Sequence, residues 1–173
     1  MTCGTEVGTD FILKGKVAGA SVEISADRST CIGTTISNPG LYAIGSGEIQ
    51  FTGLTVKQPA GCKTSSSITT KSLETQVMME GATVYSRFRP SSGTVLANLS
   101  LTECAAEGTY PLKGTMFGRF PNSTGVLAAE QNWSFSSTIN ATAGGALTLG
   151  FEPATLTGEE RFSTFGSTWG ATE

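Results

Sequence analysis

Apolar residues in this chain recur at every second position, in short segments that Gly, Pro, Asn or Ser interrupts. The pattern is clearest in the segments 20–26, 73–79, 95–101 and 127–135. Successive side chains of a β-strand point to opposite faces, so this spacing is typical of strands with one buried face. We find no convincing run of apolar residues at helical spacing. We therefore expect an all-β fold, an antiparallel β-sandwich or barrel of about ten short strands.

The length and composition fit a single domain, which we place at residues 1–173. A chain of 173 residues is long enough to bury roughly two-thirds of its unfolded surface in one core. Charged residues make up only 14% of the chain, which contains 22 Gly and is rich in Thr and Ser. Thr packs well on a pleated sheet, and Gly and Ser supply turns, so the composition agrees with the strand pattern.

The stretch 132–151 contains no Asp, Glu, Lys, Arg, His, Cys or Tyr. We interpret it as part of a hairpin from Leu127 to Phe151, in which Leu147, Leu149 and Phe151 face inward. A neutral strand that is exposed lacks the Lys or Glu that usually prevents pairing with another chain. We therefore expect this hairpin to be covered, either by a second sheet of the same domain or by a neighbouring subunit.

The four cysteines, Cys3, Cys31, Cys62 and Cys104, are widely spaced, and the chain has no His to complete a zinc site. An even number of such cysteines predicts two disulfides, with four reduced thiols as the alternative. Of the three connectivities we favour Cys3 with Cys31 and Cys62 with Cys104, because each closes a loop within one part of the chain. Disulfides indicate a secreted or cell-surface protein. The first ten residues do not form a signal peptide, so we expect a leader that this sequence lacks.

The charge of the chain argues against several partners. The net charge is −3 and the pI is near 5.0, and the eleven Lys and Arg residues form no cluster, so we expect no nucleic-acid binding. No apolar run reaches about 18 residues, so we expect no membrane span.

In the segment YSRFRP, Tyr85, Arg87 and Arg89 share one face of an expected strand. They are candidate contacts for a small anion or a sugar, with an ordinary solvated strand face as the alternative.

Catalytic groups are scarce. The absence of His excludes the Ser-His-Asp and Cys-His nucleophiles and the usual catalytic zinc site. Glu159 and Glu160 are neighbours on an expected strand, so they point to opposite faces and do not converge. Ser67 and Lys71 are about 13 Å apart on an extended strand, too far for proton transfer. We expect a protein that is not an enzyme and that has no catalytic residue, cofactor or metal.

Two further features of the sequence concern sugars: the N-glycosylation sequons and the tryptophans. Asn122 and Asn140 lie in N-glycosylation sequons at expected turns and are candidate acceptors. Exposed aromatic rings can stack against sugar rings. Trp169, near the end of the chain, is the candidate for such a contact, whereas Trp133 is in phase with apolar neighbours and is expected in the core.

Several phrases of the sequence resemble segments of small, secreted, Thr- and Gly-rich β proteins encoded in bacterial genomes. They are GTTISNPG, TYPLKG, INATAGGALTLG, PATLTG and a closing WGA. The resemblance covers about the last two-thirds of the chain. It implies export and a β fold, and it assigns no functional residue.

Two functional hypotheses follow. The first is a non-enzymatic extracellular structural or interaction protein that self-associates, as the subunit of a surface layer or filament. It rests on the low charge, the neutral hairpin, the cysteines and the scarcity of catalytic groups. The second is a β-sandwich module that binds carbohydrate or another small ligand. A concave pocket with converging polar groups favours binding, and strands exchanged between copies favour assembly.

Overall fold

The computed structural model describes residues 2–5, 10–37, 44–80, 83–119, 130–135 and 147–163, with side chains over 10–35, 45–77, 84–119 and 147–159. These residues form strands and turns and no helix, which confirms the all-β prediction. The strands are β1 (Thr2–Thr5), β2 (Phe11–Val17), β3 (Ala20–Ser37), β4 (Ile44–Gln58), β5 (Lys63–Thr64), β6 (Ser67–Thr69), β7 (Leu73–Glu80), β8 (Thr83–Pro90), β9 (Val95–Thr102), β10 (Gly108–Lys113), β11 (Met116–Arg119), β12 (Glu130–Phe135), β13 (Leu147–Leu149) and β14 (Glu152–Ser163).

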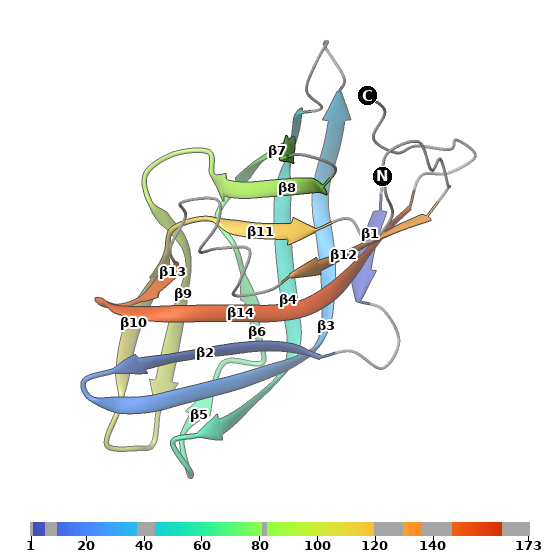
Figure 1. Ribbon diagram of the computed structural model, residues 1–173. Coiled ribbons are helices and arrows are strands. Elements are labelled where there is room, and N and C mark those ends of the chain that lie inside the picture. The colour runs from blue at the N-terminus through green and yellow to red at the C-terminus, as the bar shows by residue number, and fades with distance from the viewer. Residues whose placement is uncertain are drawn as a thin grey trace.

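All strand pairings between these elements are antiparallel, and the sheet curls strongly. Neighbouring strands follow the order β3, β4, β7, β8, β11, β12 and β14. Two further strands, β1 and β2, each lie between β14 and β3 and pair with both of them. The beginning of β14 also pairs with β13, which starts a second series of neighbouring strands in the order β13, β10, β9 and β5. We call this second series the second wing. In Figure 1 the β9–β10 hairpin runs across the direction of β2 and β14.

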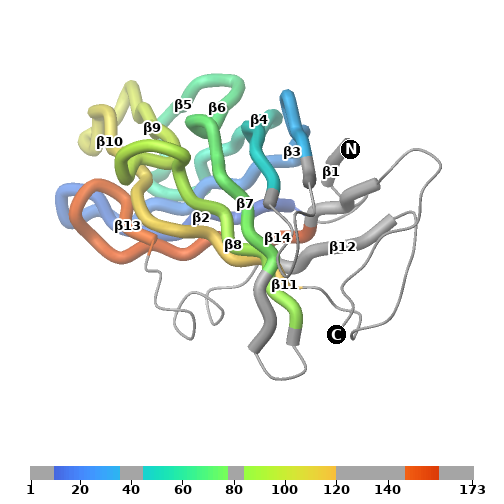
Figure 2. Tube along the Cα trace, turned by 90° about the horizontal axis from the view of Figure 1, so that it is seen from above, coloured from blue at the N-terminus to red at the C-terminus, as the bar shows by residue number. Residues whose placement is uncertain are grey.

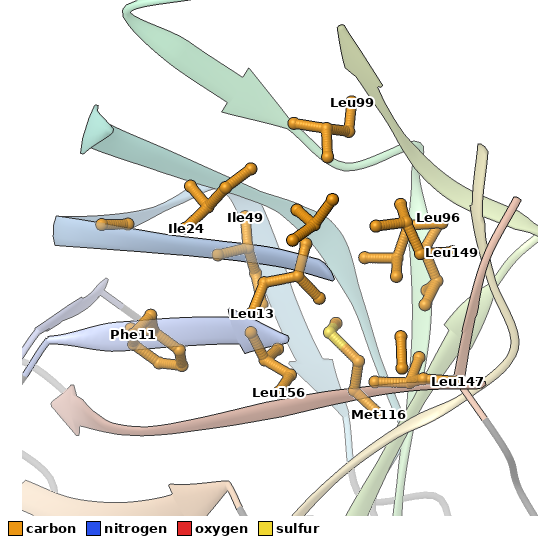
Figure 3. Packing of buried hydrophobic residues seen from close by; sticks show 14 of the residues in the cluster. Phe11, Leu13, Ile24, Ile49, Leu96, Leu99, Met116, Leu147, Leu149 and Leu156 are labelled. Carbon is orange, nitrogen blue, oxygen red and sulfur yellow. The ribbon is translucent and has the colours of Figure 1, made fainter. Parts of the chain in front are cut away.

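The hydrophobic core lies where the second wing faces the curled sheet. Seen from above in Figure 2, β10 and β13 gather at one side, and β3 and β4 lie further across. Figure 3 shows core side chains from both parts, with Phe11, Leu13 and Leu156 on one side and Leu96, Leu147 and Leu149 on the other. Val22 and Ile24 of β3 are buried, as the alternation in 20–26 predicts.

A β-bulge in β9 changes which residues of that strand reach the core. Alternation predicts one inward row that contains Val95, Ala97 and Leu99. In the structure Lys113 of β10 pairs with Val95 while Leu112 pairs with Ala97, so Leu96 is the extra residue between them. A bulge turns the strand locally, and Leu96 becomes fully buried while Val95 is half-buried.

The hairpin expected from Leu127 to Phe151 is wrong in its strand partners. β12 pairs with β11 and β14, and β13 pairs with β10 and β14, so neither strand pairs with the other. Leu147 and Leu149 are buried as expected, but Phe151 is 96% exposed. The chain turns back at Gly150, whose φ of +64° suits glycine and whose N–H donates to the carbonyl of Pro111 at 2.8 Å. This turn takes Phe151 out of the strand, beneath the Lys113 ammonium group, which lies 5.6 Å from the ring centre.

The cysteines whose side chains the structure describes form disulfides. Cys62 and Cys104 are bonded, which confirms that pairing, and the bond joins the turn after β4 to the turn after β9. Cys31 is also disulfide-bonded. The side chain of its expected partner, Cys3, lies outside the described residues. The backbone register agrees with the expected pair, because Gly4 lies opposite Thr30 in antiparallel strands and position 3 is then across from position 31.

Candidate functional site

The outer face of β8 carries the three side chains that the sequence indicates as ligand contacts. The residues that alternate with them on the strand are buried, so Tyr85, Arg87 and Arg89 lie on the face away from the core. The shared strand face expected from YSRFRP is therefore present. A ligand contact for these residues stays a prediction.

Arg89 is held by a carboxylate on the neighbouring strand. It lies opposite Glu74 of β7, and directly opposite residues of antiparallel strands share one face of the sheet. Arg89 Nη2 donates to Glu74 Oε1 at 2.9 Å and to Oε2 at 3.0 Å, and Nε donates to Oε2 at 3.3 Å. Both side chains are well exposed, so the pair contributes little to stability. It fixes a cation and an anion side by side at the surface.

Arg87 occupies the next position along the same face, and its charge is not paired in this way. Its Nη2 donates to the amide oxygen of Gln76, opposite it on β7. Its Nε is shielded from solvent and makes no hydrogen bond with a described residue. Phe117 of β11, opposite Arg87 on its other side, is buried. Among the described side chains Arg87 pairs with no carboxylate, so it offers a positively charged group beside the Arg89–Glu74 pair.

A polar groove of about 380 Å³ opens at the Arg89 end of this face. Its lining comes from three separate parts of the chain: Glu74 on β7, the end of β8 with the following turn at 89–94, and the turn at 114–115. Two backbone hydrogen bonds hold the turns in place. Gly114 N donates to Thr94 O at 3.2 Å, and Ser91 N donates to Ser72 O at 2.8 Å. The first bond joins the two turns to each other, and the second ties the turn after β8 to the residue that precedes β7.

The groove presents hydrogen-bond donors and acceptors alongside apolar surface, to which Pro90 belongs. Ser91, Ser92, Thr94 and Thr115 line it, and none of their hydroxyl groups bonds to a described residue. A hydroxyl both donates and accepts, whereas the guanidinium of Arg89 only donates and the carboxylate of Glu74 only accepts. Such a set can satisfy the hydroxyl groups of a sugar. The volume lies near the small end of the range of ligand pockets, about 300–1,000 Å³.

Other residues indicated by the sequence do not join this groove. Trp169, Asn122 and Asn140 lie outside the described residues, and so does the side chain of Trp133. No aromatic side chain is among the described groove residues, so a stacking platform of the expected kind is not part of that lining. Tyr85 lies on the same face of β8 but outside the groove, and its role also stays a prediction.

The candidate catalytic pairs are not brought together. Ser67 begins β6, which ends at Thr69, so Lys71 lies beyond the strand that alternation predicts. Glu159 lies on β14, and the side chain of Glu160 is outside the described residues. Within the part of the chain that the structure describes, no group of three or more His, Cys, Asp or Glu residues is arranged to hold a metal ion. The same part contains no helix that is long and apolar enough to span a membrane.

Sequence reasoning found Arg89 and missed the rest of the groove. Glu74 and Arg89 are fifteen residues apart in the chain, and only the strand register places them opposite one another. Ser91, Ser92, Thr94 and Thr115 belong to turns, where hydroxyl residues are common for reasons of backbone geometry alone. The residues of RPSSGT are common turn residues and carry no sign of a ligand.

Comparisons with protein-family models, with curated proteins and with solved structures found no match to this chain. The resemblance to secreted bacterial β proteins therefore stays a prediction.

Proposed function

We propose that this protein is a non-enzymatic extracellular interaction protein that binds carbohydrate in the groove formed by Glu74, Arg89 and the turns at 90–94 and 114–115. One observation carries the proposal: a fixed guanidinium–carboxylate pair and four hydroxyl groups without described partners line one hollow. Neighbouring hydroxyls of a sugar ring can accept from the guanidinium and donate to the carboxylate at the same time.

An extracellular location is supported by the disulfides. The Cys62–Cys104 bond is compatible with an oxidising compartment, and Cys31 is disulfide-bonded as well. The absence of His from the whole chain supports a role in binding, because it removes the commonest general base. Arg87 does not line the groove, but it lies two positions before Arg89 on the same strand face and has no carboxylate partner among the described side chains. Sugars that carry a carboxylate, such as uronic acids, therefore belong among the ligands to be tested.

Self-association into a layer or filament is the second candidate. It rests on the low charge, the neutral hairpin, the cysteines and the scarcity of catalytic groups, and of these the hairpin is not formed, because β12 pairs with β11 and β14 and β13 pairs with β10 and β14. A charge placed on β13 by Thr148→Lys tests whether this strand lies in an interface between copies of the protein. If the protein is an assembly held by this strand, light scattering will show the variant dissociated and still folded, and an unchanged particle size will remove β13 from the interface.

The carbohydrate proposal is tested by calorimetric titration with oligosaccharides of glucose, galactose and mannose and with the matching uronic acids. We expect at least one of them to bind the parent protein. Glu74→Gln and Arg89→Gln should each weaken that binding by roughly 10- to 100-fold, because each removes a hydrogen bond to a charged group.

The chain supplies a matched control for this titration. Lys14 of β2 and Glu23 of β3 form a cross-strand ion pair of the same kind, with 3.1 Å between Nζ and Oε2, and neither residue lines the groove. Lys14→Gln and Glu23→Gln should leave the affinity unchanged. The proposal fails if no saccharide binds, or if the control variants weaken binding as much as the groove variants do.

A further inference from the structure

A second cavity lies inside the fold and shares no residue with the groove. Its volume is about 50 Å³, and most of its lining residues belong to β2, β3, β4, β6, β9, β10, β11 and β14. The lining residues are Phe11, Leu13, Ile24, Ala26, Phe51, Leu54, Ile68, Thr70, Leu96, Ala97, Asn98, Leu99, Leu112, Met116 and Leu156. Figure 3 shows several of them, with Met116 between the side chains of β2 and β14 and those of the second wing.

The chemistry of the lining excludes water. A cavity needs only about 10–15 Å³ to hold a water molecule, but that water needs two to four polar partners. Thr70 is the polar residue buried in the lining, and its hydroxyl already accepts a hydrogen bond from Ile49 N at 2.9 Å. The other polar lining residue, Asn98, is exposed. The space is therefore large enough for a water molecule but offers it almost nothing to bind.

The cavity has a closed side and an accessible side. Leu96, Leu99 and Met116 on the closed side are at most 2% exposed. Phe51 and Leu54 of β4 and Ile68 of β6 are half-buried, and Asn98 of β9 is exposed. An apolar group can enter between the half-buried side chains of Phe51, Leu54 and Ile68, whereas Asn98 points to the opposite face of β9 from the buried Ala97 and Leu99. Met116 has three rotatable side-chain bonds, so it can move to enlarge the space.

We propose that this cavity is a binding site for a short apolar group of a few carbon atoms. Entry of such a group removes its surface from water and restores van der Waals contacts that the lining lacks. Apolar cavities of about 150 Å³ in proteins bind benzene or xenon. This cavity is smaller, so it suits xenon, cyclopropane or the methyl end of an acyl chain. The groove and the cavity are independent, and either proposal can fail without the other.

The test is a titration of the protein with cyclopropane and with xenon, followed by methyl NMR. We expect saturable shifts of the Leu99 and Leu156 methyl groups, with dissociation constants roughly in the millimolar range because so few ligand atoms make contact. Ala26→Val and Ala97→Val each add two carbons to a buried lining residue and should abolish the shifts. Ala60→Val adds the same atoms at an exposed turn and should change nothing.

A third probe, octanoate, distinguishes a free small molecule from an acyl chain. If the site takes an acyl chain, octanoate should bind more tightly than cyclopropane by roughly 10-fold or more, because more of its carbon atoms leave water. If octanoate binds no better than cyclopropane, the site takes small apolar molecules. The proposal is overturned if none of the three probes gives saturable shifts, or if the shifts persist in both filled variants.

Discussion

Replacing both Cys62 and Cys104 by alanine should lower the free energy of unfolding by roughly 4 kcal/mol. The two residues are 42 positions apart, and the cross-link removes the entropy that a loop of this length has in the unfolded chain. The bond also lies where the short strand β5 begins, which pairs with the end of β9 through only two residue pairs. Equilibrium urea unfolding of the oxidised parent and the double variant measures the difference.

Replacing each cysteine singly tests whether the two residues stabilise the protein through one shared bond. Cys62→Ala and Cys104→Ala break the same bond, so each should cost nearly as much as the double variant, and the costs should not add. The exposed ion pair next to the bond, Lys63 with Glu103 at 2.6 Å, is the control. Lys63→Gln should change stability by at most about 1 kcal/mol. Additive single costs, or a double variant as stable as the parent, would contradict a disulfide between these residues.

Truncating Leu149 should cost about 2–5 kcal/mol of unfolding free energy, the usual range for a buried leucine changed to alanine. Leu149 is fully buried, although β13 has only three residues. Its surroundings are tight: a Cβ added to Gly15 of β2 would lie 3.4 Å from Leu149 Cβ and 3.5 Å from its Cδ2. The space left by the side chain can therefore collapse only partly.

The neighbouring residue provides the control for this variant. Thr148 is half-buried on the other face of β13, and Thr148→Ala should change stability by no more than about 0.5 kcal/mol. Urea unfolding with unchanged slopes would show that both variants keep the same fold. Equal costs at the two positions would mean that the inward face of β13 is wrongly assigned.

The strands could be predicted from the sequence because alternation is a local property. Val22, Ile24, Leu99 and Leu101 are buried as their spacing predicts. The strand partners could not be predicted in the same way. Leu147 and Leu149 fit an inward-facing strand equally well beside β12 or beside β14, and the choice depends on the turn at Gly150 and on pairing with β10. Register across distant segments is decided by the packing of the whole sheet.

The site was predictable only in part, for the same reason. Arg87 and Arg89 are visible as a pair on one strand face, but their partners Gln76 and Glu74 become apparent only with the β7–β8 register. The apolar cavity leaves no sequence signal, because its lining residues are those of an ordinary core. Cysteine pairing was easier to predict for Cys62 and Cys104, since an even count and loop closure leave few choices.

The proposal of a carbohydrate-binding groove is tested most directly by mapping the ligand on the protein. Amide chemical shifts of isotope-labelled protein are followed while the best-binding saccharide of the calorimetric panel is added. We predict that the largest shifts occur at Ser91, Ser92, Gly93, Thr94 and Thr115, and that Arg89→Gln removes them while Lys14→Gln does not. Saturable shifts confined to another face of the molecule, or no shifts at all, would contradict the account.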